Sequence, residues 1–346
     1  MKHHTENERQ PRGAKTEHKA QKENTHKGRM DDRAELKPGA RDGITRSVFS
    51  THSPELLYCS SWDKDVRVYD TEKSTLRGHA TVGSPVLDIA VDKGTLSVFC
   101  GCLDGSVVEI DGAAMEERTI GKHLGGVKGV AQVESRVFAT GGWDKKFCLW
   151  DARAQSAQSV FDLPKKVYSI DAACEMVVVG MAERAVYLFD VRRLDRPYQK
   201  RESSLRSQTR SVRLFHDAGG FVTSSIDGRV SVDYIDDAQT PRCYAFKCHW
   251  ETITQNSERV ALVHPVHALC LDAAGQLATG GGDGKVYLWN IHTKKRVSEF
   301  MRYPSSISSL CFSGDSSRLA VASSYCFEEG EKEHGPDQVY IQQIHK

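Results

Sequence analysis

Basic side chains recur between residues 198 and 250. Arg210, Arg229 and Lys247 stand in the stretches ESSLRSQTRSVRLF, SSIDGRVSVDYI and YAFKCHW, with Arg206 and Arg213 nearby. A guanidinium fork binds carboxylate or phosphate oxygens bidentately, and charge-assisted hydrogen bonds are about twice as strong as neutral ones. Cations that come together here would therefore suit a carboxylate-rich or phosphorylated peptide. Scattered surface charge is the alternative that composition alone leaves equally open.

Stretches that look like catalytic motifs do not fit enzyme chemistry. GGDGK at 281–285 lacks the full GxxxxGK[ST] pattern of a P-loop, and it runs on into VYLWN, which is typical of a strand rather than a helix. The chain has no GxSxG nucleophile elbow and no HExxH motif. We therefore predict a protein that is not an enzyme and needs no cofactor.

The cysteines could suggest disulfides or zinc, but their spacing argues against both. No CxxC pair occurs, and the residues are scattered through strand-like runs. This pattern favours free, mostly buried thiols in a reducing compartment. Cys248 and His249 are adjacent but lack the further ligands of a structural zinc site, so no metal is expected. The ten cysteines are Cys59, Cys100, Cys102, Cys148, Cys174, Cys243, Cys248, Cys270, Cys311 and Cys326.

The elements that must position the cations belong to a repeat. GGWDKKFCLWD at 141–151 has five counterparts: SSWDKDVRVYD, GCLDGSVVEID, GMAERAVYLFD, SSIDGRVSVDYI and GGDGKVYLWN. Their turn acids follow one another at intervals of 39 to 44 residues, except for 56 residues between Asp227 and Asp283. A period of about 40–45 residues that ends in a WD-like dipeptide predicts a WD-repeat β-propeller with one four-stranded blade per repeat.

A seventh unit is present in SISSLCFSGDSSRLAVASSYCF followed by QVYIQQI, where the charged loop EEGEKEHGPD replaces the WD turn. We therefore predict an all-β, seven-bladed propeller. An N-terminal strand should pair with the last blade, because an open ring would leave sheet edges unpaired. His79, His123 and His267 lie upstream of the turns, and we interpret them as hydrogen-bonded core residues rather than metal ligands.

Composition sets the limits of the domain. Residues 1–42 contain no Phe, Trp or Tyr, so they cannot bury enough apolar area to offset their ordering entropy. We predict a disordered extension over 1–42 and the propeller over 43–346. The net charge of +1 argues against a dedicated nucleic-acid binder. No apolar run reaches the roughly 18–20 residues of a membrane span, so a soluble, intracellular protein is expected.

Two consecutive blades end in LWDAR at 149–153 and LFDVR at 188–192. These endings resemble those of propellers that serve as substrate receptors of cullin-type ubiquitin ligases. In that alternative, Arg153 and Arg192 would face the ligase adaptor.

ESSLRSQTRSVRLF, SSIDGRVSVDYI, YAFKCH, TGGWDKKFCLWD and RYPSSISSLCFS together resemble a family of WD-repeat propellers in the spindle-assembly checkpoint, the partners of Bub-type checkpoint kinases. The resemblance spans about residues 44–345 and stays in register across all blades. A sister family that acts in mRNA export and binds a nucleoporin is also similar. ESSL followed by QTR, and RYPSSIS, look more like the checkpoint branch.

The resemblance implies roles for particular residues. Both families hold a short Glu-containing peptide, the GLEBS motif, across the top face. Trp62 in SSWDKD would be an exposed aromatic anchor for it and Arg210 in QTR the partner of its Glu, with Trp143 at the same repeat position as Trp62. Arg229 in IDGR and Lys247 in FKCH would receive the phosphothreonine of Met-Glu-Leu-Thr motifs in a kinetochore scaffold.

The resemblance also implies a cellular role and leaves three departures. It implies a monomeric propeller within hetero-complexes, nuclear and partly cytoplasmic, found at kinetochores in mitosis. Trp250 follows KCH where the family usually has Arg, so an aromatic contact takes the place of one cation in the phosphothreonine site. The stretch ETITQNSERVALVHPV differs in length and composition, and the N-terminal extension lies outside the family pattern.

Overall fold

The computed structural model describes residues 33–154, 156–255 and 258–344. In this part of the chain, the strands form seven four-stranded antiparallel sheets and one two-stranded hairpin. Two short 3-10 helices are present, at Ala182–Arg184 and Asp237–Arg242. Each of the six repeats that follow the sequence signature forms one sheet, which is one blade of the propeller.

The first four blades follow the chain without interruption. Blade 1 is β2 (Ile44–Phe49), β3 (Leu56–Ser61), β4 (Asp65–Asp70) and β5 (Thr75–Thr81); blade 2 is β6 (Val86–Val91), β7 (Val98–Cys102), β8 (Ser106–Ile110) and β9 (Glu117–Lys122); blade 3 is β10 (Val127–Glu134), β11 (Val137–Gly142), β12 (Lys146–Asp151) and β13 (Ala157–Asp162); blade 4 is β14 (Val167–Ala173), β15 (Met176–Met181), β16 (Ala185–Asp190) and β17 (Gln199–Glu202).

The last three blades include one insertion and one strand from the other end of the chain. Blade 5 is β18 (Thr209–Leu214), β19 (Gly220–Ser225), β20 (Arg229–Tyr234) and β21 (Tyr244–Lys247); the inserted hairpin is β22 (Trp250–Gln255) and β23 (Glu258–Val263); blade 6 is β24 (Val266–Leu271), β25 (Gln276–Gly281), β26 (Val286–Asn290) and β27 (Lys295–Glu299); blade 7 is β28 (Ile307–Phe312), β29 (Arg318–Ser323), β30 (Gln338–Gln343) and β1 (Arg33–Glu35).

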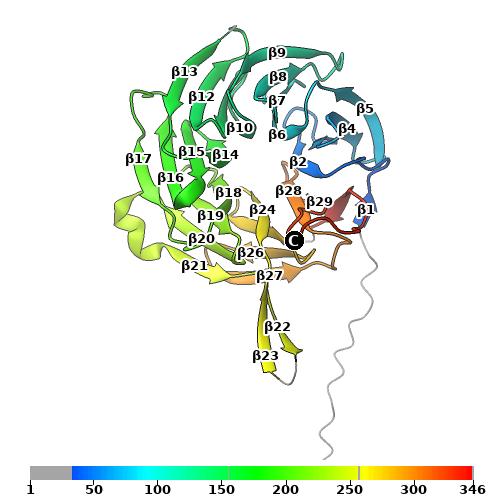
Figure 1. Cartoon of the computed structure of the whole chain (residues 1–346), viewed down its shortest axis with the longest axis vertical. Coiled ribbons are helices and arrows are strands. Elements are labelled where there is room, and N and C mark those ends of the chain that lie inside the picture. Colours follow the sequence, from blue (N-terminus) through cyan, green and yellow to red (C-terminus); the bar gives the residue numbers. More distant parts are fainter. Residues whose placement is uncertain (1–32, 155, 256–257, 345–346) are drawn as a thin grey trace, which may run out of the picture. The chain divides into compact units, whose positions relative to one another are not determined.

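The innermost strands of the blades form a closed ring. In order, β2, β6, β10, β14, β18, β24 and β28 each contact the next, and β28 contacts β2 again (Figure 1). The hydrophobic core lies between neighbouring blades rather than at the centre. Phe99 of blade 2 and Phe138 of blade 3, for example, stack with ring centroids 4.0 Å apart. The prediction of an all-β, seven-bladed WD-repeat propeller is confirmed.

The same buried hydrogen-bond network, of a histidine, an acid, a threonine and a tryptophan, is present in blades 3 and 6. In blade 3, His123 bonds to the turn acid Asp144 and, at 2.8 Å, to Thr140, which also accepts a bond from Trp150 Nε1 at 2.7 Å. The prediction that His123 is a core residue is confirmed. His79 is instead exposed on β5, so the same prediction is wrong there. In blade 1 the turn acid Asp63 pairs with Arg67 of β4 and also accepts hydrogen bonds from the Ser61 hydroxyl and the Arg41 N–H.

The ring is closed by the N-terminal strand, as expected, but that strand lies earlier than the predicted domain boundary. β1 pairs with β30 antiparallel, with Ala34 opposite Ile341. Leu36, directly after β1, is fully buried in the core between blades 7 and 1. The expectation of disorder is therefore wrong for residues 33–42. Residues 1–32 of the predicted extension lie outside the described residues.

We predict that this closing strand makes a large contribution to stability. A chain that starts at residue 43 should unfold at lower urea concentration than one that starts at residue 33. Loss of the Leu36 side chain alone should cost about 2–5 kcal/mol, because it is fully buried. Leu36→Ala in the longer chain measures that part separately. Equal unfolding midpoints for the two chains would contradict the closure.

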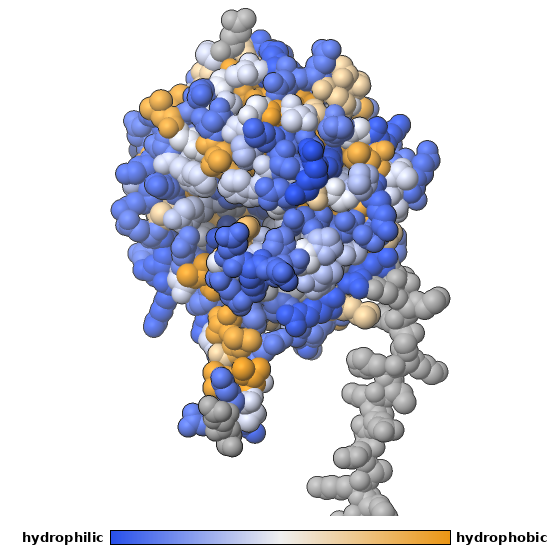
Figure 2. Space-filling view, turned by 45° about the vertical axis from the view of Figure 1, so that its right-hand side comes forward, coloured by the Kyte–Doolittle hydropathy of each residue, from blue (hydrophilic) through white to orange (hydrophobic). Residues whose placement is uncertain are grey.

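The interval of 56 residues between Asp227 and Asp283 contains the inserted hairpin β22–β23. It projects from the ring between blades 5 and 6, and apolar residues gather along it (Figure 2). Ile253, Val260 and Leu262 are 38–40% exposed there. In the described part of the chain, no helix is long and apolar enough to cross a membrane.

Candidate peptide-binding site

Three of the predicted site residues meet at the outer end of blade 5. Arg229 and Lys247 are direct partners on β20 and β21. The ring of Trp250 lies beneath both cations, with Lys247 Nζ 3.8 Å and Arg229 Cζ 5.5 Å from its centroid. Both cations therefore sit on one aromatic platform.

The turn before β20 fixes this platform. The Trp250 Nε1–H donates to the carbonyl oxygen of Asp227 at 2.8 Å. Gly228 has a φ of +67°, and a Cβ on it would lie 2.8 Å from the indole ring, so the close approach needs glycine. Asp227 also accepts a hydrogen bond from Ser225 and pairs with Arg229 at 3.4 Å. The IDGR turn thus holds the indole and one of the cations in place.

The charge of this cluster suits an anion of more than one charge. Asp227 is 28% exposed and offsets part of the Arg229 charge, whereas Lys247 is exposed on the surface. A guanidinium and an ammonium side by side can together bind several oxygens of one group. We call Arg229, Lys247 and Trp250 the cation platform.

The residues expected to hold a GLEBS-type peptide lie on three different blades. Trp62 is 41% exposed in the turn between β3 and β4, where its backbone N–H bonds to the Gly43 carbonyl. Trp143 is half-buried in the corresponding turn of blade 3. Arg210 lies on β18 in blade 5. Among the described residues, no hydrogen bond or ring contact joins these three side chains.

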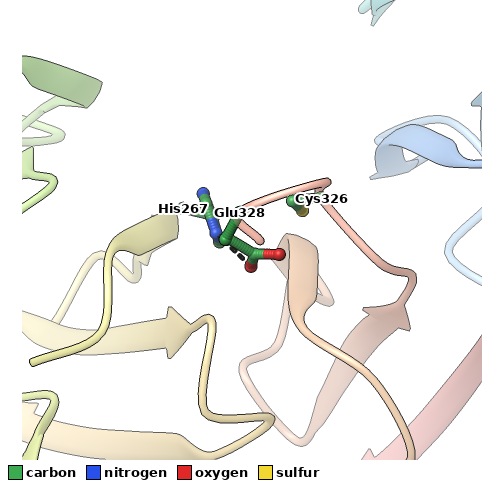
Figure 3. Close-up of side chains that lie close together, drawn as sticks. All are labelled: His267, Cys326 and Glu328. Atoms are coloured by element: carbon green, nitrogen blue, oxygen red, sulfur yellow. Dashed lines mark hydrogen bonds and ion pairs between the residues drawn. The ribbon is translucent and has the colours of Figure 1, made fainter. Parts of the chain in front are cut away.

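Arg210 begins a chain of polar contacts that sequence patterns did not reveal. Its guanidinium donates to His267 Nδ1 at 2.8 Å. His267 Nε2 in turn donates to a carboxylate oxygen of Glu328 at 2.7 Å (Figure 3). Burial lowers the pKa of His267. Burial alone would raise the pKa of Glu328, but hydrogen bonds from His267 and Ser306 outweigh it and lower the pKa to about 2.

The donor pattern at His267 is unsuited to a metal. Cys326 lies close to His267 and Glu328, so three potential ligands are near one another. Because Arg210 can only donate, His267 Nδ1 must accept, and the ring proton sits on Nε2. A metal at Nε2 would force that proton to Nδ1, against the Arg210 guanidinium. The interpretation of His267 as a hydrogen-bonded residue fits this geometry.

A cleft of about 880 Å³ opens beside this chain of contacts, at the seam of blades 6 and 7. Arg210, His267 and Glu328 line it, and the exposed side chains of Leu262 and Phe327 lie at its rim. Phe327 belongs to the loop that replaces the WD turn of blade 7 and has a φ of +57°, which is unusual for an aromatic residue. The cleft was not predicted from the sequence.

The remaining cations of the expected basic patch lie apart from the platform. Arg213 donates to the carbonyls of Leu269 and Val212 on the inner strands, and Arg206 is exposed before β18. Arg153 and Arg192, the residues of the ubiquitin-ligase alternative, each form a bidentate pair with the acid that ends the third strand of their own blade. The two cations that converge are therefore Arg229 and Lys247.

The sequence is similar to those of known WD-repeat proteins. The model of the WD domain, G-beta repeat, matches residues 116–151 and 257–290. The mitotic checkpoint protein bub3 of Dictyostelium discoideum is 38% identical over 317 residues, which cover 90% of this chain and 94% of that protein. Mitotic checkpoint protein BUB3.1 of Arabidopsis thaliana is 38% identical over 324 residues, covering 90% and 93%.

More distant similarities agree with the fold. Protein Rae1 of Drosophila melanogaster is 28% identical over 325 residues, covering 89% of this chain and 92% of that protein. The solved structure of U3-55K aligns with a TM-score of 0.77 at 14% identity, covering 90% and 98%, and supports the propeller fold alone. With 38% identity over nine-tenths of its length, the chain belongs to the Bub3 family of mitotic checkpoint WD-repeat proteins.

Proposed function

We propose that this protein is a non-catalytic adaptor that holds a GLEBS-type peptide of Bub-type checkpoint kinases and binds phosphorylated Met-Glu-Leu-Thr motifs of a kinetochore scaffold. The observation that carries the proposal is the convergence of Arg229 and Lys247 over Trp250. Phosphorylation of the motif is then the signal that recruits the kinases. The adaptor would act in the nucleus and, during mitosis, at kinetochores.

The cation platform favours a phosphate over a carboxylate. A phosphothreonine carries about −1.5 to −2 charge and three acceptor oxygens. Asp227 already offsets part of the Arg229 charge, so a singly charged carboxylate gains less than a phosphate does. Lys247 is exposed on the last strand of the blade, where a peptide can approach from solvent.

Trp62 and Arg210 support the second half of the proposal. The Trp62 ring is exposed while its backbone is fixed, so little ordering entropy is lost when a peptide covers it. Arg210 has five N–H donors and uses one nitrogen on His267, so donors remain for a glutamate of the peptide. Trp143 offers a smaller exposed face in the same repeat position.

The proposal is tested by fluorescence anisotropy of labelled phosphorylated and unphosphorylated Met-Glu-Leu-Thr peptides, titrated with the protein and a saturating GLEBS-type peptide. We expect binding that requires the phosphate and weakens with added salt. Equal affinity for the two peptides, or no affinity for either, would contradict the phosphothreonine site while leaving the GLEBS-type site to be measured separately.

Replacing the exposed indole tests the GLEBS-type site. Trp62→Ala should lower the affinity for the GLEBS-type peptide by about 10- to 100-fold, which is the range for an aromatic hot spot at an interface. Calorimetric titration with the peptide measures this. Tyr198→Ala is the matched control, because Tyr198 is an aromatic residue 58% exposed on the separate surface of blade 4. Unchanged affinity for Trp62→Ala would remove this residue from the site.

The second candidate is an mRNA-export propeller that binds a nucleoporin. It is favoured by the 28% identity to Drosophila Rae1 and to the mRNA export factor GLE2 of Chaetomium thermophilum. It predicts co-purification with a nucleoporin and accumulation of poly(A) RNA in nuclei after depletion. Neither result is expected for the checkpoint adaptor.

A further inference from the structure

Two cysteines occupy the same register on adjacent inner strands. Cys270 is the fifth residue of β24 in blade 6, and Cys311 is the fifth residue of β28 in blade 7. β24 and β28 contact each other in the inner ring. Arg210 and His267 are both second residues of adjacent inner strands, and their side chains meet at 2.8 Å. Side chains in equal register therefore come together at these seams.

The two sulfur atoms lie at the same seam. The backbone N–H of Phe312, the residue after Cys311, donates to Cys270 Sγ at 3.1 Å. The Cys311 thiol donates to the carbonyl oxygen of the same residue, Phe312, at 3.4 Å. Cys311 Sγ also accepts the N–H of Phe49 from blade 1, at 3.4 Å. Both sulfur atoms thus bond to the backbone of Phe312, which brings the two cysteines together at this seam.

The surroundings lower the pKa of the Cys311 thiol. The hydrogen bond from Cys270 lowers the pKa of Cys311, and the Phe49 N–H and the Arg46 guanidinium act in the same direction. Most other cysteines behave in the opposite way, since burial raises the pKa of Cys59, Cys102 and Cys148. A thiolate beside a second thiol is the arrangement of reversible redox pairs.

We propose that Cys270 and Cys311 are a modification site, which forms a reversible disulfide across the seam of blades 6 and 7 when the protein meets a hydroperoxide. Neither residue is fully buried, so a small oxidant can reach the pair. The site shares no residue with the cation platform or with the residues of the GLEBS-type site, Trp62, Trp143 and Arg210.

One hydroperoxide molecule is enough to oxidise the two thiols to a disulfide. The Cys311 thiolate attacks a peroxide oxygen, forming an S–O bond and breaking the O–O bond, and the leaving oxygen takes up a proton. Cys270, losing its proton, then attacks the sulfenic sulfur, forming the S–S bond and releasing the second oxygen as water. The peroxide gains the two electrons that the two thiols lose. A dithiol reductant reverses the modification by thiol–disulfide exchange.

The disulfide would add a covalent link between two blades that are otherwise joined by side-chain packing, by hydrogen bonds and by the intervening chain. It closes a loop between residues 270 and 311, and closing such a loop restricts the unfolded chain. Oxidised protein should therefore unfold at a higher urea concentration than reduced protein. Adding a dithiol reductant should restore the lower midpoint.

Peptide mapping of the purified full-length protein tests the proposal. The protein is treated with hydrogen peroxide at neutral pH, unfolded, alkylated and digested without reductant. We expect that two of its ten thiols are lost to alkylation and that one peptide pair, linked through Cys270 and Cys311, is found by mass spectrometry. Linkage through other cysteines, or oxidation of Cys311 to sulfinic acid with no linked peptide, would overturn the proposal.

Variants separate the pair from general oxidation. Cys311→Ser should abolish both the linked peptide and the shift in urea midpoint. Cys174→Ser should leave both unchanged, because Cys174 is the exposed cysteine on the turn between β14 and β15. If Cys311→Ser fails to fold, the linked peptide and the midpoint shift in the wild type and in Cys174→Ser still decide the outcome.

Discussion

Reversing the charge of both Arg229 and Lys247 should abolish binding of a phosphorylated Met-Glu-Leu-Thr peptide while leaving the propeller folded. Each charge-assisted hydrogen bond contributes about 1.5–3 kcal/mol, so each single reversal should weaken binding by at least about 10-fold. Both side chains are partly or fully exposed, so neither substitution buries a charge. Anisotropy titrations give the affinity, and circular dichroism checks the fold.

A control separates the platform from the general field of the protein. Lys295 is an exposed lysine on β27, so Lys295→Glu makes the same change of charge on a neighbouring blade. That variant should keep its affinity to within about 2-fold at physiological salt, because charges farther than a Debye length of about 8 Å are screened. Similar losses in Lys295→Glu and Lys247→Glu would mean that overall charge, and not the platform, controls the binding.

The fold could be predicted because the repeat encodes it locally. Turn acids at nearly even intervals and alternating apolar residues specify hairpins without any long-range information. An N-terminal closing strand was expected, but the position of β1 before residue 43 was missed for the opposite reason. Its three residues, Arg33–Glu35, have no strand pattern, and only pairing with β30 at the other end of the chain makes them a strand. Tertiary context thus decides such a short segment.

The proximity of candidate site residues was predictable where neighbours in space are neighbours in the hairpin. Arg229 and Lys247 lie on adjacent strands of one blade, so the motifs IDGR and FKCH place them together. The contact of Arg210 with His267, and of His267 with Glu328, joins residues 57 and 61 positions apart on different blades. Such contacts depend on the relative register of separate sheets, which no single motif records.

The histidines illustrate the same limit. His123 and His249 bind the turn acids, whereas His79, in a similar position before a turn, is exposed. The difference lies in the partners. Blades 3 and 6 supply a threonine and a tryptophan at matching positions of the sheet, namely Thr140 with Trp150 and Thr279 with Trp289. A sequence pattern that requires the histidine, the turn acid, the threonine and the tryptophan together would have selected His249 and rejected His79.

The network around His249 should connect stability to the cation platform. His249 is fully buried, bonds to Asp283 at 2.9 Å and lies between Lys247 and Trp250 in the chain. Asp283→Ala should cost about 3–5 kcal/mol in the free energy of unfolding, the range for removing one partner of a buried pair. Because it also releases the segment that positions Trp250, the phosphopeptide should bind about 10-fold more weakly.

The same pair predicts a dependence on pH. Burial raises the pKa of Asp283, but the hydrogen bond and charge of His249 outweigh it, so the pKa lies below its ordinary value. A lowered folded-state pKa stabilises the protein above the unfolded pKa of about 4, and this contribution is lost as the pH falls through the folded value. Urea unfolding of Asp283→Asn should therefore lose less stability than the wild type between neutral and acidic pH.

Asp144→Ala is the matched control, because it removes the same acid from the equivalent network around His123 in blade 3. The two variants should lose similar stability, since both leave a buried histidine without its acid. Only Asp283→Ala should also weaken the binding of the phosphopeptide, because blade 3 contributes no residue to the cation platform. If both variants bind the phosphopeptide as tightly as the wild type, Trp250 is held by its bond to Asp227 alone. The network of blade 6 then stabilises the fold without affecting the binding site.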